Sequence, residues 1–308
     1  MHEISVAFGP DKGLIGTLTL PAAAGQEAPA PLAMILFNAG VVHRIGPHRI
    51  NVKLARELAL HGLPTMRFDL HGMGDSLGAT GKLSYEQQVV SDLCAAMDTL
   101  QDVTGVRHFA VLGFCSGALP SYWVAQHDAR VRHIILYDAF ALQTPKSRRR
   151  LFVTRLIKHC RDPVAIVSWL RRSARILPRM LKTRLPRGSV ESAPSFADAP
   201  SNIQMSKGFM QLAQRGVHVS LLQSGADFSN VNYASQIAEC FGFGGAATTN
   251  LRTGWLASID HIMTSTSAQR DFANWICADV LADEHAAPNA GQHVIADPLP
   301  AMQAQTVR

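Results

Sequence analysis

The chain has 308 residues, of which 47% are apolar and 17% charged, and it carries a formal net charge of +6. No run approaches the roughly 18 uninterrupted apolar residues of a membrane-spanning helix, and no basic leader with an apolar run opens the chain, so we expect neither a span nor a secretory signal. Its five cysteines are scattered without a C-x-x-C pair, which argues against a disulfide framework or a zinc site and favours the reducing cytoplasm.

Short apolar runs alternate with amphipathic segments along most of the chain. We expect strands at 3–8, 13–20, 32–37, 63–68, 107–114 and 131–138, and helices at 50–61, 84–100 and 116–127. After residue 205 the pattern predicts a helix to 215, a strand at 217–223, a helix near 231–241, a weak strand near 248–252 and a helix at 266–281. This alternation predicts an α/β fold, in which a mostly parallel sheet has helices on both faces.

The alternation breaks at about residue 141. From there to 205 the sequence is basic and helix-like and is interrupted by prolines, so we expect a helical cap (141–205) inserted after the sixth strand. The predicted α/β core then comprises residues 1–140 and 206–282. Residues 283–308, rich in Ala, Pro and Gln, are expected to form a mobile tail.

The segment GFCSG at 113–117 follows an apolar strand and leads directly into a helical pattern. This is the form of a nucleophile elbow, a strained strand-to-helix turn, with Cys115 at the position where serine is usual. The flanking glycines let strand and helix approach closely, and the helix N-terminus favours a thiolate. Cys115 is therefore the candidate nucleophile, although a small buried residue in such a turn would give the same pattern.

A base and an acid follow the nucleophile in the order typical of this architecture. His261 lies in a loop before the last predicted helix, and Asp227 lies in a loop after the strand at 217–223. Asp227 could instead cap a following helix, and Asp138, at the end of the preceding strand, is the rival acid. Asp260 is too close in sequence to His261 to orient it comfortably.

The stretches LFNAGVVHRIGPHR (36–49) and RFDLHGMGDS (67–76) resemble the hydrolases associated with exosortase systems and the serine-aminopeptidase-like esterases. Over residues 1–282 the chain is similar to the α/β-hydrolase superfamily. In that group the elbow normally holds serine, whereas Cys115 makes the chain similar to dienelactone hydrolases and cysteine-dependent thioesterases. The resemblance implies a catalytic triad of Cys115, Asp227 and His261.

The oxyanion hole of such an enzyme combines two backbone N–H groups. We expect one from Ser116 and the second from Gly40 or Val41, in the loop that follows the strand at 32–37. His43 and Arg44 come next in the sequence. They either tie down this loop or line the mouth of the site and bind an anionic group of the substrate.

Together these features predict a cysteine-dependent hydrolase of thioesters or activated esters that works through an acyl-enzyme. An acyltransferase and a non-catalytic binding scaffold are the alternatives. No cofactor or metal is expected, and the oligomeric state is left open. The segment 146–187 has 14 Lys/Arg against one acid, giving +13 and leaving −7 for the rest of the chain. This basic segment is either a solvated surface or a site for an acyl-carrier protein, CoA phosphates or an anionic membrane, and nucleic acid is not expected.

Overall fold

A computed structural model of the protein describes residues 1–22, 30–139, 142, 144–160, 202–225, 231–243 and 250–285. Eight strands form one sheet in the order β1-β2-β4-β3-β5-β6-β7-β8. The strands are β1 (His2–Phe8), β2 (Leu14–Leu20), β3 (Ala33–Leu36), β4 (Thr65–Asp69), β5 (Phe109–Phe114), β6 (Val131–Tyr137), β7 (His218–Ser224) and β8 (Leu251–Leu256). The pairs β1–β2 and β2–β4 are antiparallel and all the others are parallel.

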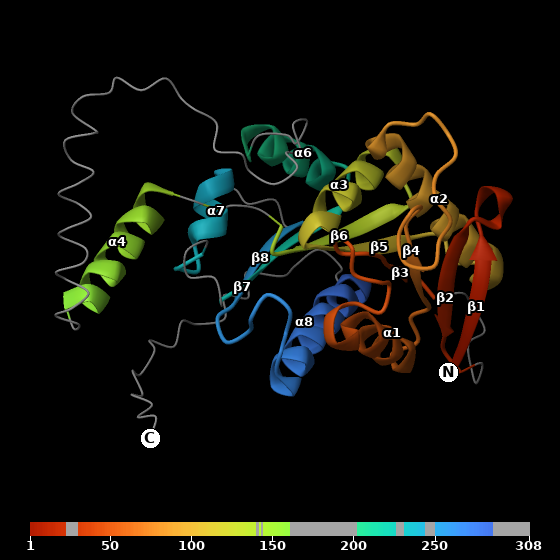
Figure 1. Ribbon diagram of the computed structural model, residues 1–308, viewed down its shortest axis with the longest axis horizontal. Coiled ribbons are helices and arrows are strands. Elements are labelled where there is room, and N and C mark those ends of the chain that lie inside the picture. Colours follow the sequence, from red (N-terminus) through yellow and green to blue (C-terminus); the bar gives the residue numbers. More distant parts are fainter. Residues whose placement is uncertain are drawn as a thin grey trace.

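Helices cover both faces of this sheet (Figure 1). Helices α1 (Ile50–Leu60) and α8 (Thr266–His285) lie on one face, and α2 (Tyr85–Thr104), α3 (Ala118–His127) and α6 (Asn202–Gln214) lie on the other. The short helix α7 (Gln236–Phe241) and the helix α4 (Pro145–Cys160) lie beyond the β7–β8 end of the sheet. The prediction of a mostly parallel α/β sheet with helices on both faces is confirmed.

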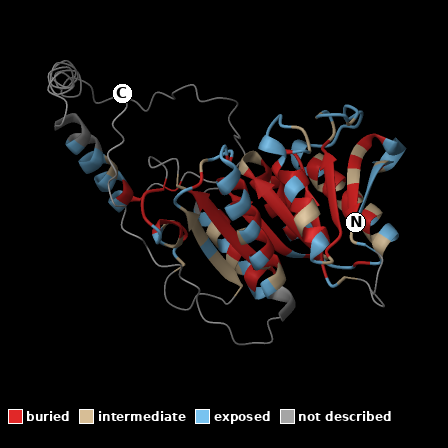
Figure 2. Cartoon of the chain, turned by 90° about the horizontal axis from the view of Figure 1, so that it is seen from below, coloured by how far each residue is buried: buried red, intermediate tan, exposed pale blue. Residues whose placement is uncertain are grey.

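Apolar side chains on both faces of the sheet explain why it forms. The β3 strand is buried along its whole length, and two apolar clusters lie on opposite faces. In one cluster Leu54 and Phe272, both fully buried, belong to α1 and α8. Burying a side chain of this size contributes roughly 1.5–3 kcal/mol, so the summed apolar burial dominates the stability of the sheet. Figure 2 shows the buried strands between more exposed helical surfaces.

Local signals set the ends of several elements. Ser84 caps α2 through a capping box with Gln87, and Gly105 ends this helix with a φ of 73°. Two predicted boundaries were wrong. The helix expected near 231–241 begins only at Gln236, and the strand expected near 248–252 lies at Leu251–Leu256. The β8 strand is a half-exposed edge strand, so its sequence lacks the continuous apolar run that marks a buried strand.

The predicted cap at 141–205 lies mostly outside the described residues, and so does the predicted tail at 283–308 apart from the end of α8. Both therefore stay predictions. The described part of the segment after β6 contains α4, which is drawn largely in the colour of exposed residues at one end of Figure 2. Among the described residues, no helix is both long enough and apolar enough to cross a bilayer.

Candidate active site

Cys115 lies at the carboxyl end of the central strand β5, in a one-turn helix (Cys115–Gly117) that leads into α3. Its φ of 51° is in the left-handed region, a strained conformation for a side chain of this kind. Both glycines of the motif lie in crowded surroundings, and Gly113 is the more tightly confined. A Cβ on Gly113 would lie 2.7 Å from the Cα of Ala118, and one on Gly117 would lie 3.2 Å from the carbonyl oxygen of Asn38. The segment therefore has the geometry expected of a nucleophile elbow.

His261 is the base that the fold brings to this thiol. Its ring is hydrogen-bonded to Cys115, and its Nδ1 lies 2.8 Å from Oδ2 of Asp138. The imidazole stacks on the ring of Tyr137, with 11° between the two planes, and it lies 5.3 Å from the ring of Phe114. Two aromatic side chains from neighbouring strands thus help to fix the imidazole plane.

Asp138 directly follows β6 and is the acid that contacts the imidazole. Its second oxygen, Oδ1, accepts a 2.6 Å hydrogen bond from the backbone N–H of Ser224 at the end of β7. The residue has a φ of 48°, and its side chain is 9% exposed. The carboxylate is therefore held between the imidazole and the end of the next strand, the arrangement needed to orient a histidine base.

The other two candidate acids are Asp227 and Asp260, and no contact of the described residues joins either of them to the imidazole. Asp227 lies outside the described residues, so its assignment as the triad acid stays a prediction, although the Nδ1 position that it would need is occupied by Asp138. Asp260 is turned to its own loop, where its Oδ1 accepts hydrogen bonds from the N–H groups of Ile262 and Thr264 at 3.1 and 3.0 Å.

The electrostatics of the three residues favour a thiolate beside an imidazolium. The hydrogen bond with His261 lowers the pKa of Cys115 against the opposing effect of burial, and the backbone N–H of Ser116 lowers it further. The hydrogen bond to Asp138, followed by the one to Cys115, raises the pKa of His261 to about 10. In contrast, burial raises the pKa of Cys94 and of Cys277 to about 11. Cys115 is thus the most readily ionised of these three thiols at neutral pH.

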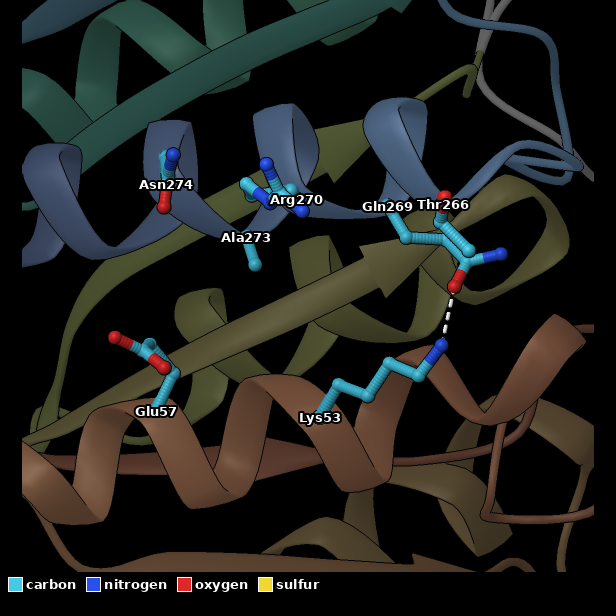
Figure 3. Close-up of a pocket in the computed structure, with 7 residues that line it drawn as sticks. All are labelled: Lys53, Glu57, Thr266, Gln269, Arg270, Ala273 and Asn274. Carbon is cyan, nitrogen blue, oxygen red and sulfur yellow. Dashed lines mark hydrogen bonds between the residues drawn. The ribbon is translucent and has the colours of Figure 1, made fainter.

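A buried glutamine, which the sequence analysis missed, holds the loop that carries His261. Gln269, in the first turn of α8, donates from Nε2 to the carbonyl oxygen of Met263 at 2.8 Å and accepts a hydrogen bond from Lys53 of α1. Figure 3 shows the Lys53–Gln269 contact across a groove between the two helices. No residue of Figure 3 belongs to the elbow or the triad, so the groove is separate from the candidate site. The sequence carries no signal for this role, because a polar residue in a helix is usually solvated.

The two predicted oxyanion-hole segments meet next to Cys115. The N–H of Gly40 donates to Oγ of Ser116 at 2.6 Å, and the N–H of Ser116 contacts the Cys115 sulfur. Gly40 has a φ of 56°, which suits glycine at this turn. Val41, the other candidate donor, is 93% exposed. Of the two, Gly40 is the residue whose N–H is directed to the elbow.

Arg44 ties down the loop rather than facing a substrate. Its Nη1 bonds to Asp69 and lies 2.7 Å from both Oδ2 of Asp75 and Nε2 of His43. Burial alone would lower the pKa of Arg44, but the hydrogen bonds to Asp75 and Asp69 raise it. His43, Asp69 and Asp75 are close enough together to suggest a metal site, yet the guanidinium of Arg44 already occupies the centre of the cluster. These contacts support a role for His43 and Arg44 in tying down the loop, rather than in binding an anionic group of the substrate.

Comparison with known proteins agrees with this geometry. Residues 33–199, more than half of the chain, match the model of the family described as serine aminopeptidase, S33. The chain belongs to this family. It is an α/β-hydrolase, and the expected membership of the α/β-hydrolase superfamily is confirmed.

Solved structures with the same fold come from several bacteria. An α/β serine hydrolase without a lid from Xanthomonas campestris is 13% identical, with a TM-score of 0.52 over 93% of this chain and 96% of that one. A putative dienelactone hydrolase from Klebsiella pneumoniae is 12% identical, with a TM-score of 0.54 over 91% and 98%. The esterase domain of a Rhodothermus marinus protein is 14% identical, with a TM-score of 0.52 over 91% and 98%. No curated protein matches the chain significantly.

Proposed function

We propose that this α/β-hydrolase is a cysteine-dependent acyl hydrolase that cleaves thioesters or activated esters through an acyl-enzyme on Cys115. The observation that carries the proposal is one continuous chain of contacts. Cys115, in a left-handed backbone conformation at the end of β5, is hydrogen-bonded to His261, whose Nδ1 is bonded to Asp138. A purely structural cysteine requires neither the strained turn nor a histidine that is itself oriented by a buried carboxylate.

The proposed mechanism uses each of these groups at a defined step. The Cys115 thiolate attacks the acyl carbonyl, and the electron pair of the C=O bond moves onto its oxygen. The N–H groups of Ser116 and Gly40 bind that oxyanion, for which the Ser116 hydroxyl must leave the Gly40 N–H. Collapse of the adduct expels the thiolate or alkoxide, which takes a proton from the His261 imidazolium. His261 then accepts a proton from water as the water attacks the thioester of the acyl-enzyme. This second adduct collapses by breaking its C–S bond, which releases the carboxylic acid and restores the Cys115 thiolate beside the His261 imidazolium.

The thiol nucleophile narrows the substrate class. A thiolate expels an amine from an amide poorly, whereas a thiolate or a stabilised alkoxide is a good leaving group. Among proteins of the same fold, one is described as a putative dienelactone hydrolase and another as an esterase domain. Both descriptions name enzymes that cleave ester bonds, which is consistent with cleavage of an activated ester. An acyl thioester also reacts with amines and alcohols, so acyl transfer remains the alternative outcome for the same intermediate.

The basic helix α4 is the candidate contact for an anionic carrier of the acyl group. Arg150 is used internally, because its Nη1 donates to the carbonyl oxygen of Asn232 at 3.1 Å and its guanidinium lies over the ring of Tyr233. All three arginines are exposed, but Arg148 and Arg149 take no part in these two contacts. We propose that these two, rather than Arg150, attract the phosphates of CoA or the acidic surface of an acyl-carrier protein, with an anionic membrane as the alternative partner.

Intact-mass spectrometry of the full-length protein tests the function. Incubation with a panel of acyl-CoA thioesters and aryl esters should add one acyl mass to Cys115 and release the acid. Cys115→Ala should abolish both the adduct and the turnover, and Cys94→Ala is the matched control with both retained. An added amine or alcohol that diverts the acyl group at the expense of the free acid would assign acyl transfer. Turnover by Cys115→Ala, or no adduct with any substrate, would contradict the proposal.

A further inference from the structure

We propose that Asp69 is a positioning residue that aligns the oxyanion hole, by anchoring the loop that presents the Gly40 N–H. The inference rests on the proposed function, because an oxyanion forms only if Cys115 attacks a carbonyl. It concerns a residue that contacts neither the thiol nor the histidine. Asp69 ends β4, and its side chain is fully buried.

Asp69 gathers donors from two loops. From the loop after β3, its Oδ1 accepts hydrogen bonds from Nδ2 of Asn38 at 2.8 Å and from the backbone N–H of Arg44 at 2.7 Å. Its Oδ2 bonds to the Arg44 guanidinium and, at 3.2 Å, to the backbone N–H of Asp75 in the loop after β4. A carboxylate with this many donors fixes the two loops relative to each other.

Asn38 extends the anchor to both ends of the turn that contains Gly40. It is 3% exposed, and its Nδ2 donates to the carbonyl oxygen of Val42 at 2.8 Å as well as to Asp69. Its Oδ1 accepts from the backbone N–H of Leu70 at 2.6 Å. The turn is closed by a backbone hydrogen bond from Val42 to Ala39. Gly40 therefore sits in a short turn whose start, end and exit are all bound, directly or through Asn38, to Asp69.

The close packing around Asp69 gives independent support. A Cβ on Gly74, which has a φ of 52°, would lie 2.3 Å from the Asp69 carboxyl carbon. The backbone of the loop after β4 therefore closes over the carboxylate. The Gly40 N–H meets Oγ of Ser116 at 2.6 Å, so the anchored turn delivers its donor to the residue next to the nucleophile. A donor held in place in this way favours the oxyanion, because only the Ser116 hydroxyl, and not the turn itself, has to move before the oxyanion binds.

The test compares two reactions of the same thiol. Acylation of Cys115 by an aryl ester develops an oxyanion on the carbonyl oxygen, whereas alkylation by iodoacetamide expels iodide and does not use the hole. In Asp69→Asn, which keeps the shape but loses the charge and one of the two acceptor oxygens, the acylation rate constant should fall about 100-fold, the effect of losing one oxyanion donor. Alkylation should change by less than about twofold, and ester binding before acylation should be unchanged.

Asp92→Asn is the matched control. Asp92 is also a buried carboxylate that clamps the loop after β4, through the backbone N–H and Nδ1 of His71 at 2.9 and 2.6 Å, but it belongs to α2 and none of these contacts reaches the Gly40 loop. The ratio of acylation to alkylation should stay at the wild-type value in this variant. If Asp69→Asn does not fold, the ratio of acylation to alkylation can be measured in Asn38→Ala instead. This variant removes the hydrogen bonds of the Asn38 side chain and leaves the Asp69–Arg44 pair.

The outcomes separate the possible explanations. Equal loss of acylation and alkylation, or an unchanged ratio in both Asp69→Asn and Asn38→Ala, would overturn the positioning role. A fall of the ratio in Asp92→Asn as large as in Asp69→Asn would assign the effect to general loosening of the loop. If the wild-type protein is alkylated but never acylated, the proposed function fails, and the role of Asp69 fails with it.

Discussion

The sheet carries two clusters of similar chemical groups that differ in what they can do. At its carboxyl edge, Cys115, His261 and Asp138 form a chain in which the imidazole is 46% exposed. Between the same sheet and α8, Ser220, His133 and Asp279 lie within hydrogen-bond distance of one another, and Arg252 pairs with Asp279. The second cluster contains a serine, a histidine and an aspartate, yet Ser220 is fully buried and His133 is 1% exposed.

The difference lies in backbone conformation, order of contacts and access. Ser220 belongs to the regular strand β7, and its hydroxyl donates to Asp279 at 2.6 Å rather than to the imidazole. Cys115 stands in a strained turn, and its thiol is hydrogen-bonded to the imidazole and to the backbone N–H of Ser116. Similar residue types therefore do not by themselves form a catalytic site. The inner cluster joins α8 to the sheet, whereas the outer cluster contains the proposed nucleophile.

The sharpest test of this comparison removes each nucleophilic atom in turn. Cys115→Ala should lower the turnover of an activated ester by about 10³-fold or more, because the covalent step is lost. Ser220→Ala should leave turnover within about twofold and lower only the free energy of unfolding, by roughly 1 kcal/mol for one lost hydrogen bond. Steady-state kinetics and urea unfolding on both variants measure this. Loss of turnover in a folded Ser220→Ala protein would make the inner cluster catalytic.

The acids provide the second test. Asp138→Asn should lower turnover by roughly 10²- to 10⁴-fold, because an amide at this position stabilises the wrong imidazole tautomer. Asp227→Asn is the matched control, and we expect it to retain turnover, since Nδ1 of His261 is bound to Asp138. The reverse ranking of the two variants would return the role of triad acid to Asp227, the residue that the sequence order favoured.

Asp279, the acid of the inner cluster, should instead affect the free energy of unfolding. Burial alone would raise the pKa of Asp279, but the charge and hydrogen bond of His133, with Ser220 and Arg252, lower it to about 2. A carboxyl group with a depressed pKa in the folded state stabilises the protein above its unfolded pKa. This contribution, about 2 kcal/mol, is present above about pH 4 and is lost as the pH falls towards about 2.

Asp279→Asn should therefore lower the free energy of unfolding at pH 7 by about 3 kcal/mol, the typical cost of breaking a buried ion pair. It should also flatten the decrease in stability between about pH 4 and 2. Urea unfolding at several pH values measures both effects. A variant with the wild-type acid profile would show that another carboxylate controls this transition.

The smallest expected effect concerns the pH dependence of the outer cluster. Because the hydrogen bond with His261 lowers the pKa of Cys115, alkylation by iodoacetamide should stay fast below about pH 8.5, the ordinary pKa of a thiol. In His261→Gln the rate should be lower at neutral pH and should fall about tenfold for each pH unit below the raised thiol pKa. Peptide mapping should place the label on Cys115 and not on Cys94 or Cys277. Identical pH profiles for wild type and variant would contradict the thiolate–imidazolium pair.

Much of the fold could be predicted from the chain because local patterns determine it. Buried parallel strands appear as continuous apolar runs, as at β3 and β5, and amphipathic spacing marked α1, α2 and α8. The elbow was also readable, since a glycine lies two residues before and two residues after Cys115, and a Cβ on Gly113 would come within 2.7 Å of Ala118 and Gly117, which follow closely in the chain. The edge strand β8 was misplaced because half-exposed strands carry no such run.

The sequence by itself determined the α/β class and indicated the candidate nucleophile and the candidate base, because each depends on neighbours along the chain. Only the tertiary structure decided which acid meets His261, since Asp138 and the Ser224 N–H come together through the parallel pairing of β6 and β7. The tertiary structure also showed that the Arg44 guanidinium is hydrogen-bonded to Asp69, and that Gln269 is hydrogen-bonded to the loop that carries His261. Hydrogen bonds between residues far apart in the chain leave no periodic signal in a single sequence, because they depend on how strands and loops meet at one edge of the sheet.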